Sequence, residues 1–314
     1  MPARCALPIH SRDRYVTDGG IETWLMYKKG FELPHFASFY LLDIPAGREA
    51  LREYYRSFVA VAQQFQSKYI FCSLTYRASR DWGNLLGYSK AALAEMNHKA
   101  FAFYREIATE MGTKEIDTLY SGCIGPRGDA YNLNQTMTSA EAEDYHAEQI
   151  ATFVAAKADI VTAMTLNSVE EGIGIARAAR LAGIPSVISF TVEKDGSVGG
   201  RHSLRRAIEL VDAETDAAPA YYMLNCAHPL DFWNALEEGP WMQRLMGVRA
   251  NSSSLAHGQL CQLGRLDEGD WKDLARRHAD LNARYPHMNV FGGCCGTDSV
   301  HVAGIFSALS QRPL

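Results

Sequence analysis

The chain has 314 residues, and its 31 Lys and Arg residues against 36 Asp and Glu residues give a formal net charge of -5. No stretch gathers the basic residues that nucleic acid or an anionic lipid surface would require, so neither is expected as a partner. There is no run of about 18 uninterrupted apolar residues, and residues 1–14 have no apolar core, so we expect a cytoplasmic protein without a membrane span.

Eight short runs rich in β-branched and aromatic residues predict strands. In chain order they are Tyr15–Thr17, Tyr69–Thr75, Thr118–Cys123, Ile160–Thr165, Ser186–Thr191, Tyr221–Asn225, Met246–Ala250 and Met288–Phe291. Segments with apolar residues three and four positions apart lie between most of these strands and predict helices. Examples are Ala50–Gln66, Lys90–Met111, Ser139–Ala156, Val169–Ala182 and Asp270–Arg284.

Strand and helix alternate along the whole chain without a Pro/Gly-rich linker. This alternation predicts an α/β fold, a single-domain (β/α)8 TIM barrel over residues 1–314, with a doubly wound open sheet as the alternative. The one long irregular stretch, Gly125–Thr138, follows the third predicted strand. Because the loops after the strands form the active-site face of a barrel, we expect this stretch to overlie the mouth of the site.

The seven cysteines are odd in number and sparse, which favours reduced thiols over a disulfide framework. Cys294 and Cys295 are adjacent, are flanked by glycines and follow the last predicted strand, whereas Cys226 follows the sixth. Neighbouring strand residues point to opposite faces, so both thiolates reach one ion only where the backbone leaves strand geometry, which flanking glycines permit. Three thiolates on the catalytic rim, with a vacant fourth position, predict a catalytic zinc site.

Two other interpretations of these three cysteines remain open. Free cysteines often pack as small hydrophobes, and adjacent cysteines can be oxidised to one another in a metal-free oxidoreductase. The other four cysteines do not belong to a comparable motif and are assigned to packing or to the surface, although one of them ends a predicted strand. They are Cys5, Cys72, Cys261 and, at the strand end, Cys123.

Four segments, each after a predicted strand, resemble the homocysteine S-methyltransferase family, which includes betaine-, S-methylmethionine- and folate-dependent enzymes. They are Thr17–Gly20, Gly122–Pro126, Asn225–Cys226 and Gly292–Gly296, and the resemblance runs nearly end to end. It implies that Cys226, Cys294 and Cys295 bind Zn²⁺. It also implies that the thiol amino acid is held by Asp18 and by the backbone at Gly19 and Gly20.

Two asparagines next to strand ends extend the resemblance. Asn225 belongs to the Asn-Cys pair, and Asn251 with Ser252 resembles an Asn-Ser of the family after the seventh strand. Both asparagines are therefore candidate substrate contacts.

The implied activity is that of a thiol S-methyltransferase. Coordination to zinc removes the proton of a thiol whose pKa is about 8.5, and the thiolate then attacks the methyl group of a cationic donor. The expected partners are a small-molecule thiol such as homocysteine, giving methionine, and a free sulfonium or quaternary ammonium donor. S-methylmethionine, S-adenosylmethionine and betaine types stay open, as do a different thiol acceptor, a zinc-storage role and homo-oligomerisation.

A cationic donor favours an aromatic surround. The candidate rings are Trp24, Tyr76, Trp82 and Tyr131. Tyr76 is preferred because it follows the second predicted strand and resembles a tyrosine of the betaine-dependent relatives. His228, two residues from Cys226, is expected to be packed or exposed and not to lie beside the metal.

One position departs from the family. After the fourth strand the family commonly has a glutamate that contacts the amino group of homocysteine, and this chain has Met164 there. We therefore expect Glu22, Asn167 or Glu193 to meet that amino group, or the acceptor to be a different thiol.

Overall fold

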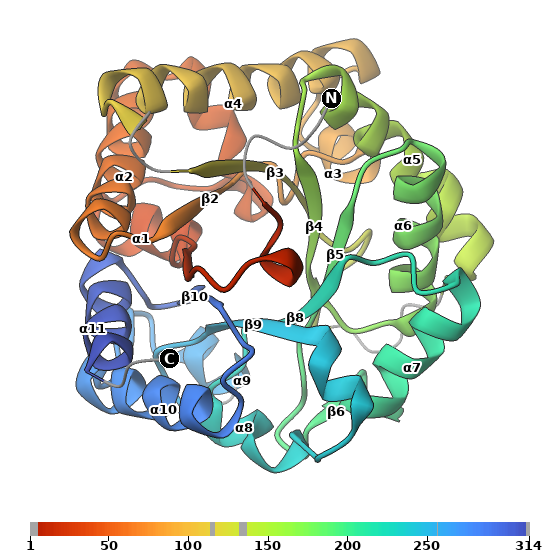
Figure 1. Cartoon of the computed structure of the whole chain (residues 1–314). Coiled ribbons are helices and arrows are strands. Elements are labelled where there is room, and N and C mark those ends of the chain that lie inside the picture. The colour runs from red at the N-terminus through yellow and green to blue at the C-terminus, as the bar shows by residue number, and fades with distance from the viewer. Residues whose placement is uncertain (1–5, 114–116, 132–136, 256, 312–314) are drawn as a thin grey trace.

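The chain folds into a closed barrel of eight parallel strands, surrounded by helices (Figure 1). The computed structural model describes residues 6–113, 117–131, 137–255 and 257–311. The strands are hydrogen-bonded in the order β1-β10-β9-β8-β5-β4-β3-β2. Their bounds are β1 Tyr15–Val16, β2 Lys68–Cys72, β3 Thr118–Ile124, β4 Ile160–Leu166, β5 Ser186–Phe190, β8 Tyr221–Asn225, β9 Leu245–Ala250 and β10 Val290–Gly293. Closure confirms the predicted (β/α)8 barrel and excludes the open sheet.

Each of the eight predicted strands overlaps one barrel strand, and only the bounds of β2 and β10 differ from the prediction by more than one residue. β2 stops at Cys72, three residues before the predicted end at Thr75. β10 extends into the glycines as far as Gly293, which stays paired with Ala250 of β9 and donates its N–H to Asp18 O. The glycines thus belong to the sheet, and the departure from strand geometry begins only at Cys294.

The predicted helices are also present, and further helices complete the outer ring. The long helices are α2 Pro45–Gln64, α4 Lys90–Glu110, α5 Ser139–Ala155, α6 Val169–Leu181, α7 Leu204–Thr215, α10 Trp271–Arg284 and α11 Ser299–Ser310. Short elements lie in the connections: α1 Ile21–Tyr27, α3 Arg80–Leu85, α8 Pro229–Phe232, α9 His257–Gln262, and the small hairpin of β6 Ser197–Val198 with β7 His202–Ser203. The β8–β9 connection has only α8 and two 3₁₀ turns, Trp233–Ala235 and Pro240–Arg244, in place of a full helix.

The N-terminal segment closes one end of the barrel, where it crosses the opening as the dark red chain in Figure 1. Leu7 and Ile9 pack against the inner apolar cluster that β1, β10 and the other strands contribute. Asn289 fixes this segment by donating from Nδ2 to Pro8 O and Ser11 O. With this end filled, the opposite end, at the carboxyl termini of the strands, remains for a binding site.

No helix in the described part of the chain combines the length and apolar character that spanning a bilayer requires.

The packing of α10 on the barrel buries a histidine. The side chain of His278 is buried, its Nδ1 donates to Leu274 O at 2.8 Å, and its ring meets that of Phe291 in β10 edge-on. Burial lowers the pKa of His278 to about 4, although the hydrogen bond to Leu274 opposes this. At neutral pH the ring is therefore neutral.

We expect His278 to make the fold acid-sensitive. Because the folded-state pKa lies below the unfolded value, stability is complete above about pH 6.5 and is lost as the pH falls toward 4, by up to about 3 kcal/mol. Urea unfolding from pH 7 to 4.5 should show this slope in the wild type and a weaker slope in His278→Gln. The exposed His10→Gln serves as control, and equal slopes in all three proteins would contradict the assignment.

Candidate metal centre

Three cysteine side chains converge at the carboxyl end of the barrel. Cys226 follows β8, and Cys294 and Cys295 follow β10, with β9 lying between those two strands. Their sulfur atoms all lie within 4.8 Å of one another, and the Sγ atoms of Cys226 and Cys295 are 3.6 Å apart. The cluster thus joins all three cysteines named from the sequence and is not limited to the adjacent pair.

The backbone at both strand ends leaves extended geometry to aim these sulfurs. Cys226 has a left-handed conformation, with φ of 59°, which non-glycine residues rarely adopt. After β10 the chain turns at once, since Thr297 donates its N–H to Cys294 O, and Gly296 inside that turn has φ of 80°. Left-handed backbone at a cysteine is a strained feature of the kind that clusters at functional sites.

The side chain of Asn225 stabilises the backbone turn at Cys226 through hydrogen bonds. Its Oδ1 accepts from Thr165 N at 2.8 Å and from Ser189 Oγ at 2.7 Å, and its Nδ2 donates to Thr165 Oγ1. Nδ2 also lies 3.8 Å from Cys294 Sγ. Thr165, like Cys226, has φ of 59°, so one buried amide secures the irregular ends of β4 and β8.

The thiols suit a divalent cation. Hydrogen bonds from Cys294 and Cys295 hold the pKa of Cys226 well below its ordinary value, against the effect of burial. The contact with Cys226 raises the pKa of Cys294 to about 12, and contacts with Cys226 and Cys294 raise the pKa of Cys295. Without a cation only one thiolate is stable here, because three negative sulfurs at this spacing repel one another. A metal ion that binds all three thiolates would remove this conflict.

A cavity of about 280 Å³ opens directly beside the cysteines. Six of the side chains or glycines proposed as substrate contacts line it: Asp18, Gly19, Gly20, Glu22, Tyr76 and Asn225. Asn251 is not among the lining residues. Its Nδ2 donates instead to Cys226 O at 2.9 Å, which supports the left-handed turn.

A buried ion pair forms the floor beside the metal ligands. Asp18 binds Arg249, a residue of β9 that the sequence reasoning missed, although a lone arginine within an apolar strand signals a buried acidic partner. Arg249 also donates to Gly293 O at 3.0 Å and to Gly19 O at 3.1 Å. Burial raises the pKa of Asp18 to about 6, although Arg249 opposes this.

Glu22 is the second carboxylate in the cavity. Its Oε1 accepts from Ser38 Oγ at 2.9 Å, and burial, with lesser effects of Cys294 and Asp18, raises its pKa to about 7. Asn167 and Glu193, the other candidates for contacting an amino group, do not line this cavity. Of the three candidates only Glu22 is in reach of a ligand bound there.

Sulfur and apolar atoms form the wall opposite the cysteines. Cys72, Cys123 and Met164 make a small buried cluster, against which Tyr76 packs. Cys72 and Cys123 are thus packing residues, as expected, but they face the cavity. Cys5 and the side chain of Cys261 lie outside the described residues.

Tyr131 and Tyr76 are the two candidate rings that reach the cavity. The Tyr131 hydroxyl lies 3.0 Å from Cys226 Sγ, so the described part of the 125–138 stretch does overlie the metal ligands, as predicted. Trp24 packs on Tyr54 outside the cavity, and Trp82 stacks on an arginine at its edge. His228 caps α8 by accepting from Leu230 N, which confirms its structural role.

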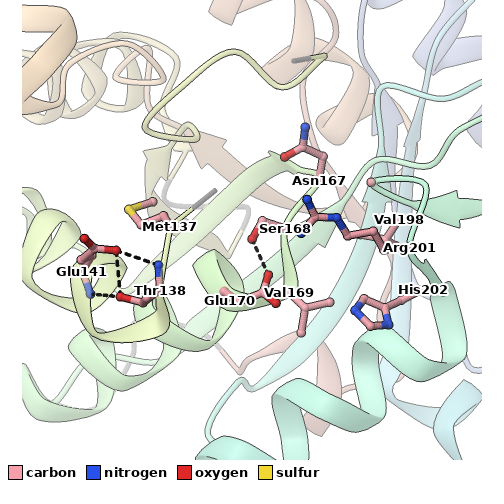
Figure 2. Close-up of a pocket in the computed structure, with 11 residues that line it drawn as sticks. Met137, Thr138, Glu141, Asn167, Ser168, Val169, Glu170, Val198, Arg201 and His202 are labelled. Carbon is pink, nitrogen blue, oxygen red and sulfur yellow. Dashed lines mark hydrogen bonds between the residues drawn. The ribbon is translucent and has the colours of Figure 1, made fainter. Parts of the chain in front are cut away.

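A second cavity, of about 250 Å³, lies beside the N-termini of α5 and α6 (Figure 2). Four of its polar side chains bond to one another at these helix starts: Thr138 with Glu141, and Ser168 with Glu170. No cysteine lines it. The chemistry therefore belongs to the first cavity.

A comparison with known families and structures agrees with this geometry. A family model described as homocysteine S-methyltransferase matches residues 15–309. The solved homocysteine methyltransferase MmuM of Escherichia coli is similar in fold. Its oxidized form has a TM-score of 0.74 and 18% identity, over 98% of this chain and 100% of that chain. Its metallated form has a TM-score of 0.72 and 17% identity, over 96% and 99%. No curated protein sequence matches the chain significantly.

We expect Asn225→Ala to destabilise the fold by about 2–3 kcal/mol, because Thr165 N and Ser189 Oγ lose their buried acceptor. Urea unfolding measures this loss. Asn234→Ala, at an exposed position, is the matched control and should change stability by less than about 0.5 kcal/mol. Equal stability of the two variants would refute the bridging role.

Proposed function

Because the chain belongs to the homocysteine S-methyltransferase family, we propose that it is a zinc-dependent enzyme that methylates homocysteine to methionine. Family membership makes it a thiol S-methyltransferase; zinc, the donor and the residue roles are the proposal. The observation that carries it is the convergence of Cys226, Cys294 and Cys295 on one cavity that also holds a carboxylate and an aromatic wall.

The three cysteine ligands favour zinc over other metal ions. Three soft thiolates in a compact, partly buried cluster are typical ligands of Zn²⁺, and a site with three protein ligands keeps a position for a substrate. A metallated form of the E. coli relative has been solved, which agrees with a metal in this chain. Bound zinc would supply Lewis acidity that keeps the substrate thiol deprotonated near neutral pH.

The chain's own residues hold and orient the reactants. The thiolate sulfur attacks the methyl carbon of the donor; the bond from that carbon to the donor's sulfonium sulfur or ammonium nitrogen breaks, and the electron pair leaves with the now neutral donor. The proton of the acceptor thiol is released to water before this step, and no covalent intermediate with the enzyme is required. The sulfur wall of Cys72, Cys123 and Met164 limits the water beside the reacting atoms.

Glu22 is the residue we assign to the amino group of homocysteine. Asp18 is already bound by Arg249, whereas the Glu22 carboxylate accepts, among the described side chains, only from the Ser38 hydroxyl. Met164, at the place of the family's glutamate, faces the cavity with an apolar side chain. The ammonium group is therefore met from the first turn of α1 instead of from the end of β4.

Metal analysis tests the cysteine assignment. Cys226→Ser, Cys294→Ser and Cys295→Ser should each fall from about one zinc per chain to a small fraction of that, and methyl transfer should drop at least about 100-fold. Cys123→Ser, a cysteine of the same cavity, should keep its zinc. Full zinc content in Cys295→Ser would sink the proposal, and a reducible disulfide without metal would favour an oxidoreductase.

Methyl transfer tests the acceptor. Wild-type activity should disappear with a chelator and return with zinc, whereas a storage protein would bind zinc and transfer no methyl group from any donor. Glu22→Gln should raise KM for homocysteine about 10-fold or more and leave KM for 4-mercaptobutyrate, which lacks the amino group, nearly unchanged. Glu32→Gln, at an exposed position, is the control. Equal effects on both thiols would exclude the amino-group contact.

A further inference from the structure

We propose that Arg77 is a carboxylate-binding residue that selects zwitterionic methyl donors, in which the onium group is joined to a carboxylate. This inference rests on the proposed function, because it names the donor class of the same cavity. Its basis is a buried cation that lines the cavity and forms no ion pair with any of the described residues.

The position of Arg77 is fixed by stacking. It follows β2, its exposed fraction is 8%, and its guanidinium carbon lies 3.9 Å from the ring centroid of Trp82 and 4.9 Å from that of Tyr76. One guanidinium nitrogen donates to Gly128 O at 3.0 Å. Two rings and one carbonyl thus hold the guanidinium in a defined orientation, as precise recognition of a planar carboxylate requires.

Arg77 has no ion-pair partner within the described residues, although the exposed Asp129 also lines the cavity. No carboxylate there forms an ion pair with it, and its buried Nε has no hydrogen-bond partner. Asp81, on the following helix, is bound by Arg127 instead. Buried arginines are almost always paired, since an isolated charge in such a place costs several kcal/mol. The missing anion is therefore best supplied by a ligand.

The other cation of the cavity is not available for this role. Arg249 already binds Asp18, Gly19 O and Gly293 O. An anionic group that enters the cavity thus finds free donors at Arg77 and not at Arg249. A carboxylate, whose two oxygens match the fork of the guanidinium, is the simplest such group.

The order of the strands assigns Arg77 to the donor. β1, which is followed by α1 with Glu22 in its first turn, pairs directly with β10, which precedes Cys294 and Cys295. β2, which precedes Arg77, pairs with β1 and β3 and with neither of the strands that precede the three clustered cysteines, β8 and β10. The acceptor, bound through its sulfur, thus lies nearest Glu22, and the donor lies beyond it, toward β2.

The same charge gives selectivity. A donor with an onium group alone would bring a second positive charge next to Arg77. A donor that also has a carboxylate neutralises the guanidinium and leaves the onium group for Tyr76 and the metal-bound thiolates. Arg77 would thus repel donors that have only an onium group and attract donors that also have a carboxylate.

Kinetics with two sulfonium donors test the assignment in zinc-loaded protein. They are 3-(dimethylsulfonio)propionate, which has a carboxylate, and trimethylsulfonium, which has none. Arg77→Gln should raise KM for the first about 10- to 100-fold with kcat within about 3-fold, and should not raise KM for the second. Arg77→Lys should recover part of the loss, because it keeps the charge but not the planar fork. Arg80→Gln, at a neighbouring partly exposed arginine, should behave as wild type.

A binding measurement separates this inference from the proposed function. Calorimetric titration with 3-(methylthio)propionate, the demethylated product, needs no turnover and should show affinity in wild type that Arg77→Gln loses about 10-fold or more. Absence of methyl transfer in wild type would overturn the proposed function, while the lost affinity would still support the anion site. Equal affinity in the two proteins, or equal KM effects on both donors, would overturn the role of Arg77. Unchanged melting temperature and zinc content establish that the variants are folded.

Discussion

The site depends on one buried ion pair, between Asp18 after β1 and Arg249 in β9. Through this pair and two carbonyl contacts, at Gly19 and Gly293, the guanidinium joins the ends of β1, β9 and β10 beside the three clustered cysteines. A buried pair of this kind adds little net stability, but loss of one partner typically costs about 3–5 kcal/mol. Its contribution is geometric: it fixes the strand ends that place the sulfurs and leaves the cavity floor without net charge.

Next to this ion pair, irregular backbone conformations orient the cysteine side chains. Cys226 and Thr165 adopt left-handed conformations that the surrounding hydrogen bonds enforce, from Asn225 on one side and Asn251 on the other. Such strain is tolerated only where neighbouring contacts over-determine it. The sulfur atoms are therefore placed before any ligand arrives, so little reorganisation is needed when a metal or a substrate binds.

Charge then divides the cavity into regions. The thiolates and Glu22 attract cationic groups near β1 and β10, and Arg77 attracts anionic ones near β2. Met164 and the neighbouring cysteines provide an apolar wall between strands β2 and β4. In the proposed binding mode a substrate amino group would meet Glu22 from the β1 side, and the end of β4 would then need no acid.

The sequence alone determined the barrel, because strands and helices recur with clear periodicity, and it identified Cys226, Cys294 and Cys295 by their place after strands. It did not determine which polar residues share the cavity. Only the closed barrel, which sets the neighbours of each strand end, shows that Glu22 lines the cavity while Asn167 and Glu193 do not. It also shows that Arg77 has no ion-pair partner among the described residues. Periodicity is a local property that hydrophobic burial imprints on the sequence, whereas the compensation of a buried charge depends on residues far apart in the chain, and only the tertiary structure decides it.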